Sequence, residues 1–139
     1  MEGIDHIGIV VKDLEKAVRL HESLGLSVSG RERLEHLQVE VAFIKINGVR
    51  IELISPLAKG HELMHHIRKH GEGLHHIAFK VKDINETLKK FKNMGIGLAQ
   101  DKPRGKGHGG KEIAFLNQDD TCGILIEVCQ EAKQKREVA

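Results

Sequence analysis

The sequence predicts an α+β fold in which two βαβββ modules form one eight-stranded cup. Three observations indicate this fold: a segment near the N-terminus recurs 70 residues later, both copies show the same succession of strand-like and helix-like patterns, and 139 residues suffice for a single compact domain. We expect that domain to cover residues 1–131, and a charged tail to follow at 132–139.

The repeat is clearest where each module begins. Segments 5–13 and 75–83 are identical at five of nine positions, and each ends in an aspartate, Asp13 or Asp83, that can cap a following helix. Gly25 and Gly95 stand where those helices should end. The second module is therefore expected to copy the order of elements in the first.

Module one, at about 3–56, is expected to hold a strand at 3–11, a helix at 13–24 and strands at 26–35, 37–46 and 49–55. Asn47-Gly48 predicts a tight hairpin turn between the last two strands. Residues 59–70 are interpreted as a linker helix. Module two, at about 73–130, should hold a strand at 73–81, a helix at 83–94 and strands near 96–100, 111–117 and 122–129. Each helix covers one face of its sheet, so the opposite faces line the cup.

Composition excludes several classes of function. The 22 basic and 20 acidic residues are intermixed, and aromatic residues make up 3% of the chain, so a nucleic-acid partner is not expected. No apolar run approaches the ~20 residues of a membrane span, and the N-terminus does not resemble a signal peptide. Cys122 and Cys129 form no disulfide framework, which suits a cytoplasmic protein.

Strand alternation turns two histidines and two carboxylates toward the cup. On the strands at 3–11 and 73–81 the apolar alternate positions suit the helix side, so His6 and His76 point the other way. The same test turns Glu52 and Glu127 inward. Imidazole and carboxylate are ligands for Co²⁺, Zn²⁺, Mn²⁺ or Ni²⁺. Because both kinds of ligand recur in the repeat, we expect one divalent metal ion per chain.

A third carboxylate is also expected to face the cup. Val39, Val41 and Phe43 form an apolar row along one strand, so Glu40 should point to the opposite side. Glu40 is therefore a candidate catalytic base, and an exposed edge carboxylate is nearly as good an interpretation.

A short motif offers a competing interpretation as a zinc peptidase. The presumed linker helix contains an HExxH run, but Arg68 stands where the extended motif needs glycine, and a peptidase would leave the internal repeat unexplained. A solvated, histidine-rich helix is the preferred interpretation of the run, which is His61-Glu62-Leu63-Met64-His65.

Six segments carry a resemblance to a known family: Asp5-His6-Ile7-Gly8-Ile9-Val10-Val11, Ile51-Glu52-Leu53-Ile54, Gly71-Glu72-Gly73-Leu74-His75-His76-Ile77-Ala78, Pro103-Arg104-Gly105, Ile113-Ala114-Phe115-Leu116 and Gly123-Ile124-Leu125-Ile126-Glu127. Together they resemble the methylmalonyl-CoA epimerases of the vicinal-oxygen-chelate, or glyoxalase, superfamily, over nearly the whole chain to about Gln130. The resemblance implies the glyoxalase-like fold, an acyl-CoA substrate and a homodimer. It also implies a metal bound by His6, Glu52, His76 and Glu127.

The resemblance implies an enzyme that interconverts (R)- and (S)-methylmalonyl-CoA by removing the proton at C2, through a metal-stabilised enediolate. Inversion needs an acid/base on each face of C2. Glu40 and Glu127 are the expected pair, with Glu112 and Glu35 in reserve.

Substrate binding is expected near the glycine-rich loop 105–110. Arg104, Lys106 and Lys111 flank this loop and could meet the anionic CoA, and a solvated hairpin loop is an equally good interpretation. Two runs depart from the epimerase pattern, and they bear on the identity of the substrate more than on the metal site. They are Asn117-Gln118-Asp119-Asp120 and Glu35-His36-Leu37-Gln38.

Two alternative functions remain open at this point. An enzyme like glyoxalase I, a lactoylglutathione lyase that isomerises a glutathione hemithioacetal, would use the same four ligands and is the leading alternative. A metal-free protein that binds a small molecule is the third, but the four Phe of the chain hardly supply an aromatic cleft.

Overall fold

The computed structural model describes residues 1–102 and 104–132, so Pro103 and most of the predicted tail, 133–139, lie outside the described residues. The chain divides into two compact units. The N-terminal unit is Ile4–Ile77, and the C-terminal unit combines Met1–Gly3 with the described residues from Ala78 onward. Strands β1 (Gly3–Val10) and β5 (Gly73–Lys80) each begin in one unit and end in the other.

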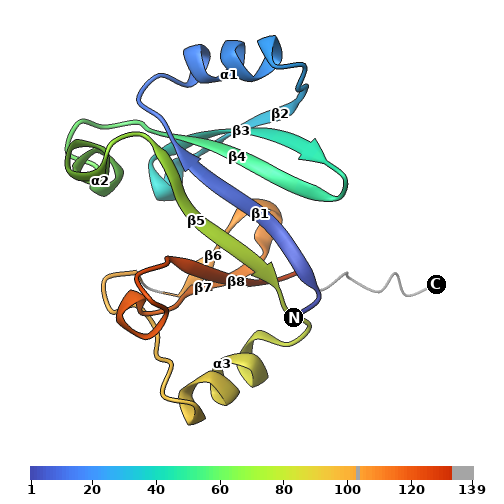
Figure 1. Cartoon of the computed structure of the whole chain (residues 1–139), viewed down its shortest axis with the longest axis vertical. Coiled ribbons are helices and arrows are strands. Elements are labelled where there is room, and N and C mark those ends of the chain that lie inside the picture. Colours follow the sequence, from blue (N-terminus) through green and yellow to red (C-terminus); the bar gives the residue numbers. More distant parts are fainter. Residues whose placement is uncertain (103, 133–139) are drawn as a thin grey trace. The chain divides into compact units, whose positions relative to one another are not determined.

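The N-terminal unit contains module one and the linker helix in the predicted order (Figure 1). Its strands are hydrogen-bonded in the order β2-β3-β4-β1-β5, with β1 parallel to β4 and both hairpins antiparallel. After β1, the elements are α1 (Leu14–Ser23), β2 (Val28–Leu34), the 3-10 turn η1 (Glu35–Leu37), β3 (Val39–Ile46), β4 (Val49–Pro56), α2 (Glu62–His70) and the start of β5.

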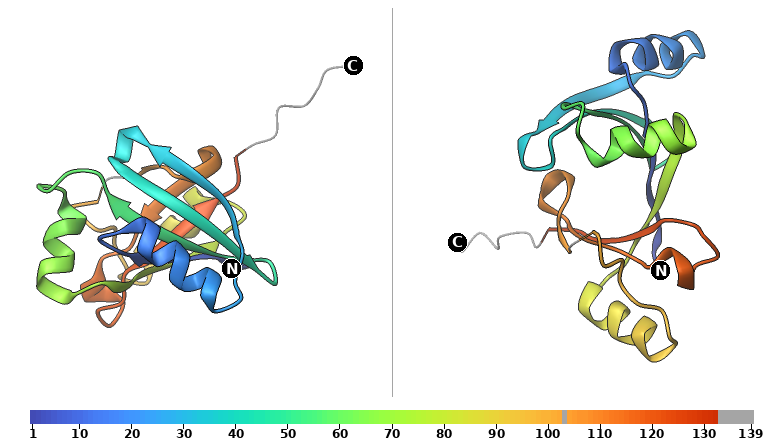
Figure 2. Two further views of the ribbon diagram at one scale, coloured as in Figure 1. Left: turned by 90° about the horizontal axis from the view of Figure 1, so that it is seen from above. Right: turned by 90° about the vertical axis from the view of Figure 1, so that its left-hand side faces the viewer.

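Helix α1 begins and ends where the sequence predicts. The Asp13 carboxylate accepts a hydrogen bond from the Lys16 backbone N–H at 3.1 Å, and Gly25 adopts a φ of +88° just after the helix. The helix lies against one face of β3 and β4 (Figure 2). A bidentate ion pair between Arg31 and Glu15 fastens α1 to β2, and this hydrogen-bonded guanidinium holds the pKa of the Glu15 carboxyl below its usual value.

The tight turn between β3 and β4 sets the register of their pairing. Asn47 and Gly48 have φ values of +48° and +81°, and positive φ at both central residues is the requirement of a type I′ turn. Counting back from this turn pairs Phe43 with Glu52. Directly paired residues share a face, and Phe43 belongs to an apolar cluster separate from the one beneath α1. Glu52 therefore points away from α1, as predicted.

The C-terminal unit repeats the order of one strand, one helix and three strands, and the three strands after the helix are shorter than those of module one. Its strand order is β5-β8-β7-β6. Ile84, Ala114 and Val128 form the core on the side where α3 contacts β8. The elements after β5 are α3 (Ile84–Asn93), β6 (Gly105–Lys106), the 3-10 turn η2 (His108–Gly110), β7 (Glu112–Phe115), the 3-10 turn η3 (Gln118–Asp120) and β8 (Ile126–Gln130).

One predicted strand is wrong. Residues 96–100, all within the described part of the chain, form no strand, and Leu98 makes an isolated bridge to Leu116. Gly95 and Gly97 flank this segment, and glycine weakens strands because it has no side chain to pack. Strand β7 pairs with β8 and also with β6, and β6 lies inside the predicted glycine-rich loop.

Two predicted boundaries also differ. Strand β8 begins at Ile126 rather than Cys122, because Cys122 and Gly123 adopt φ values of +57° and +81° in a turn. Helix α2 begins at Glu62 rather than residue 59. The described residues nevertheless form eight strands and three α-helices, so the predicted α+β class and strand count are confirmed. None of the described helices is long and apolar enough to cross a membrane.

Candidate metal centre

Three of the four predicted metal ligands lie together in the N-terminal unit. His6 stands on β1, Glu52 on β4 and His76 on β5. The register of β1 and β4 pairs His6 with Arg50, two positions before Glu52, so His6 and Glu52 share one face. His6 Nε2 lies 3.0 Å from His76 Nε2 and 3.1 Å from Glu52 Oε2. Two imidazoles and one carboxylate thus converge.

The spacing and burial of these atoms fit a divalent cation. Metal–ligand bonds of about 2.1 Å that meet at angles near 90–110° place neighbouring ligand atoms roughly 3.0–3.4 Å apart, which matches the observed separations. The residues are buried, with exposed fractions of 6% for His6, 7% for Glu52 and 8% for His76. A buried carboxylate costs free energy without an opposite charge, so a cation between these groups stabilises them.

Asp5 and Arg50 extend the site behind the ligand atoms. Asp5 Oδ2 accepts a hydrogen bond from His6 Nδ1 at 2.7 Å and another from Arg50 Nη2 at 3.0 Å. Arg50 Nη2 also lies 3.3 Å from Glu52 Oε1, and its guanidinium lies 5.8 Å from the centre of the Phe43 ring. With neutral imidazoles, the form that binds a metal, the two carboxylates and one guanidinium carry a net negative charge. That charge favours the binding of a cation.

Gly8 and His75 hold the second histidine ring in place. A Cβ atom on Gly8 would lie 2.2 Å from His76 Cε1, so the ring can occupy its place only above a glycine. His75 Nδ1 lies 2.9 Å from His76 Nδ1. The His75 ring in turn meets the His66 ring edge-on, at 4.8 Å between centroids. His76 is therefore constrained by both shape and hydrogen bonding.

The fourth predicted ligand, Glu127, lies on β8 in the C-terminal unit. Its exposed fraction is 4%. Glu127 pairs with Phe115, whereas Ala114 and Val128 fill the core on the side of α3. Since successive strand residues alternate between faces, Glu127 points away from α3, as predicted. Its role as a ligand remains a proposal.

The orientation predicted for Glu40 is wrong. Glu40 pairs with Ser55 and so lies on the face that α1 covers, opposite to the face of Glu52. The reserve candidate Glu112 pairs with Gln130 and lies on the α3 side of its own strands. The physical reason is that β3 is apolar on both faces, so alternation alone allowed two orientations. The apolar row that the prediction placed beneath α1 lies on the other side.

The three basic residues predicted to meet CoA lie in the C-terminal unit, each beside an acidic residue. Arg104 Nη2 and Lys106 Nζ lie 3.9 Å and 3.8 Å from the two carboxylate oxygens of Glu112. Lys111 is 9% exposed, and its Nζ lies 3.4 Å from Glu131 Oε1. Arg104 and Lys106 are exposed, and their two positive charges outnumber the single negative charge of Glu112. An anion can therefore approach them.

The HExxH run forms no peptidase site. His61 precedes α2 as its N-cap residue rather than standing within the helix. Its Nδ1 accepts from the Leu63 backbone N–H at 3.0 Å, and its Nε2 donates to the Leu37 carbonyl at 2.8 Å. Both ring nitrogens are therefore used locally, and His61 cannot join His65 as a chelating pair on one helix face.

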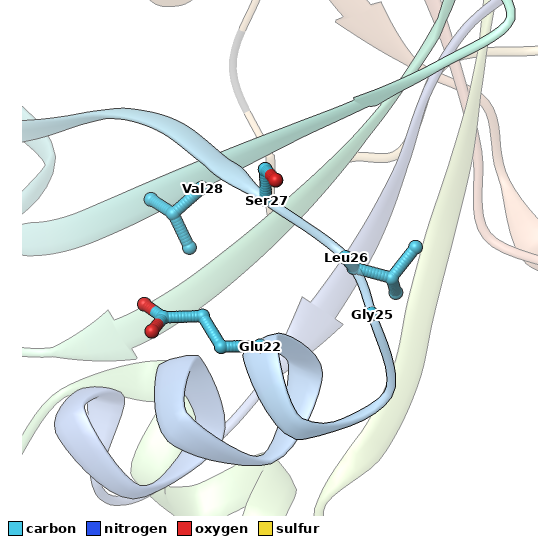
Figure 3. Close-up of a pocket in the computed structure, with 5 residues that line it drawn as sticks. All are labelled: Glu22, Gly25, Leu26, Ser27 and Val28. Carbon is cyan, nitrogen blue, oxygen red and sulfur yellow. The ribbon is translucent and has the colours of Figure 1, made fainter.

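A separate pocket lies between the C-terminal end of α1 and the start of β2 (Figure 3). Among the described residues that line it, Glu22 is the one ionisable side chain. A single carboxylate without a partner of complementary chemistry does not make an acid/base pair or a chelating group. The lining residues are Glu22, Gly25, Leu26, Ser27 and Val28.

Comparisons with known proteins agree with this geometry. Residues 5–115 match the family described as Glyoxalase/Bleomycin resistance protein/Dioxygenase superfamily. The chain therefore belongs to the glyoxalase/bleomycin resistance protein/dioxygenase superfamily. Within it, the chain is similar to proteins named methylmalonyl-CoA epimerase, as its sequence segments predicted.

Three relatives illustrate this similarity. The chain is 37% identical over 131 residues to the uncharacterized protein YqjC of Bacillus subtilis (strain 168), covering 94% of this chain and 93% of that protein. It is 32% identical over 130 residues to the ethylmalonyl-CoA/methylmalonyl-CoA epimerase of Cereibacter sphaeroides, covering 91% and 96%. A solved structure of methylmalonyl-CoA epimerase in complex with methylmalonyl-CoA and NH4+ matches with a TM-score of 0.85 and 32% identity, covering 95% and 96%. The predicted glyoxalase-like fold is thereby confirmed.

Proposed function

We propose that the protein is an epimerase that interconverts (R)- and (S)-methylmalonyl-CoA by moving the proton on C2. The observation that carries the proposal is the convergence of His6, Glu52 and His76 at one buried place. This group occurs in a chain that resembles, over nearly its whole length, proteins named as epimerases of methylmalonyl-CoA. Cytoplasmic location and assembly as a homodimer, both expected from the sequence, belong to the same proposal.

The proposed metal ligands are His6, Glu52, His76 and Glu127, and the ion is Co²⁺, Zn²⁺, Mn²⁺ or Ni²⁺. Glu127 is included because it is buried and stands in module two where Glu52 stands in module one. When bound, the ion supplies Lewis-acid stabilisation of the negative charge that the thioester and carboxylate oxygens acquire as C2 loses its proton. The protein's own contribution is to hold the ligands rigidly and exclude water from around them.

An acid/base is needed on each face of C2, and we propose Glu127 and Glu35 for these roles. Glu40 is replaced in this scheme because it lies beneath α1. Glu35 belongs to η1, where its carboxylate is exposed and lies 2.9 Å from Arg33 Nε. The strand ends that flank η1 contribute to the apolar cluster on the Glu52 side of β3. The 3-10 turn therefore connects two strand ends that both contribute to this cluster.

The acyl-CoA is proposed to meet the protein at the loop that carries β6. Arg104 and Lys106 offer exposed positive charge to its phosphates, and Glu112 keeps their side chains together. Lys111, which is mostly buried beside Glu131, is assigned to holding this loop in place and to only a minor part of the binding.

Deuterium exchange tests the proposal directly. Metal-loaded protein is incubated with methylmalonyl-CoA in D₂O, and deuterium at C2 is followed by mass spectrometry. We expect rapid wash-in that depends on the protein. Absence of wash-in, combined with turnover of methylglyoxal and glutathione, would replace the epimerase by the alternative that resembles glyoxalase I.

Two matched substitutions test the acid/base assignment. Glu35→Gln removes a proposed proton acceptor without changing shape, and should slow wash-in by about 10²- to 10⁴-fold with the metal content unchanged. Glu40→Gln is the control, because Glu40 lies on the other face of its strand. Equal rates in the two variants would contradict the assignment of Glu35.

A further inference from the structure

We propose that Asp5 and His75, the residues that immediately precede the two ligand histidines, are positioning residues that hold each imidazole in the tautomer whose Nε2 binds the metal. The inference rests on the metal site of the proposed function. It adds to that site two residues that touch neither the substrate nor the metal and act through the ligands. No part of it depends on which reaction the protein catalyses.

The tautomer matters because an imidazole offers only one lone pair when it is neutral. A histidine that binds a cation through Nε2 must carry its proton on Nδ1, and an acceptor at Nδ1 favours that form and fixes the plane of the ring. In this structure Nε2 of both His6 and His76 points into the site, since these two atoms lie 3.0 Å apart. Each Nδ1–H therefore needs a hydrogen-bond acceptor.

For His6 the acceptor is the Asp5 carboxylate, at 2.7 Å from Nδ1 to Oδ2. An ionised carboxylate only accepts, so the proton of this hydrogen bond belongs to His6 Nδ1. Asp5 is 2% exposed, and Arg50 Nη2 donates to the same Oδ2 at 3.0 Å. The guanidinium therefore both compensates the buried negative charge and fixes the direction of the carboxylate.

For His76 the partner is the ring of His75, at 2.9 Å between the two Nδ1 atoms. When His76 uses Nε2 as a ligand, its Nδ1–H donates to the lone pair on His75 Nδ1, and His75 carries its own proton on Nε2. The orientation of His75 is set in turn by its edge-on contact with His66. His75 therefore orients His76 as Asp5 orients His6, but its acceptor is a neutral imidazole and not a carboxylate anion.

Asp5 and His75 occupy equivalent places in the repeat, 70 positions apart. The duplication has thus kept the function of the preceding residue while changing its chemistry. Because a carboxylate increases the basicity of the imidazole more than a neutral ring does, Asp5 should contribute more to metal affinity than His75.

The test measures zinc binding and imidazole tautomers, and needs no turnover. Zinc dissociation constants are obtained by competition with a chromogenic chelator for the wild type and for Asp5→Asn, His75→Phe, His75→Asn and His65→Phe. We expect zinc to bind about 10- to 100-fold more weakly to Asp5→Asn and roughly tenfold more weakly to His75→Phe, while His75→Asn, whose amide oxygen can accept from His76 Nδ1, stays within about threefold of wild type. His65 is an exposed histidine of α2, so His65→Phe is the matched control and should bind zinc as the wild type does.

A spectroscopic measurement separates orientation of the ligands from a merely structural effect. Long-range ¹H–¹⁵N correlation spectra of the zinc-loaded wild type report which ring nitrogen carries the proton, and we expect Nδ1–H for both His6 and His76. This result stands even where a variant fails to fold. An unprotonated Nδ1 on either ligand, or unchanged zinc affinity in folded Asp5→Asn and His75→Phe, overturns the inference. Failure of the wild type to bind zinc overturns the metal site itself, and normal zinc binding without deuterium wash-in overturns only the proposed reaction.

Discussion

Strands β1 and β5 carry the proposed ligand histidines, His6 and His76, at equivalent positions but support them differently. On β1, His6 is held by a buried carboxylate that is itself held by Arg50. On β5, the His75 imidazole contacts His76, and Gly8 leaves room for the His76 ring because it has no side chain. The comparison shows that both modules have the histidine, whereas the residue that contacts its Nδ1 differs between them.

A similar difference separates the second strands of the two modules. Strand β2 has seven residues and pairs along most of its length with β3. Strand β6 has two residues, Gly105 and Lys106, and is followed by Gly107, Gly109 and Gly110. The first module therefore provides a rigid, buried cluster, and the second leaves this part of the chain as a loop that carries exposed basic residues. Rigid elements suit the orientation of a metal, and loops suit the binding of a long, charged ligand.

The largest expected effect comes from removing either ligand histidine. His6→Ala and His76→Ala should each reduce bound metal to a small fraction of one equivalent and slow deuterium wash-in by about 10³-fold or more, since several kcal/mol of charge stabilisation are lost. Metal content after dialysis, measured by mass spectrometry, checks this. Full occupancy in one variant and none in the other would mean that β1 and β5 are not equal partners.

The next effect concerns the glycine beneath His76. Gly8→Ala should lower the free energy of unfolding by about 1–3 kcal/mol and weaken metal binding, because the new methyl group would occupy the place of the imidazole. Gly30→Ala, also within a strand, is the control, because a Cβ there meets no atom within 4 Å. Denaturant unfolding and chelator competition measure both quantities. Equal effects of the two substitutions would show that the His76 ring does not need this space.

A moderate effect is expected from the loop of the second module. Reversing the charge of both Arg104 and Lys106 to Glu should raise KM for the acyl-CoA by roughly tenfold with little change in kcat, and the difference should shrink at high salt. The double variant Lys89→Glu/Lys90→Glu, at exposed positions of α3, changes the net charge by the same amount and is the control. If this control raises KM equally, the effect comes from the total charge of the protein and the loop has no specific role.

The smallest effect is expected from the ion pair that joins α1 to β2. Because Arg31 lowers the pKa of Glu15, the pair stabilises the fold above the ordinary pKa of a glutamate, and that contribution is lost as the pH falls through the lowered value. Glu15→Gln should therefore lower Tm slightly at neutral pH and leave it unchanged at strongly acidic pH. The pair is exposed, so a large change in Tm would indicate that α1 depends on it more than its geometry suggests.

The orientation of Glu40 follows from strand register and not from alternation. Alternation along β3 alone is ambiguous, because this strand is apolar on both faces. The Asn47-Gly48 turn already held the missing information, because a two-residue hairpin pairs Ile46 with Val49 and therefore places Glu40 on the face opposite to Glu52. Register, rather than pattern, would have removed Glu40 from the candidates.

Other features of the site were beyond sequence reasoning. Gly8 stands where the second module has Ala78, and this difference does not show that an imidazole lies against Gly8. The sequence also gives no signal for the role of Arg50. Its contacts with Asp5 and Glu52 depend on the parallel pairing of β1 with β4, which joins segments more than 40 residues apart.

By itself, the sequence determined most of the order of elements, the caps of α1 and α3, the hairpin turn and the four candidate ligands, because these depend on local propensity, short-range periodicity and an internal repeat. Only the tertiary structure decided which carboxylates share a face with the histidines and which neighbours orient them. Those outcomes depend on the parallel pairing of β1 with β4 and on side-chain contacts between distant segments, and local sequence patterns do not specify either.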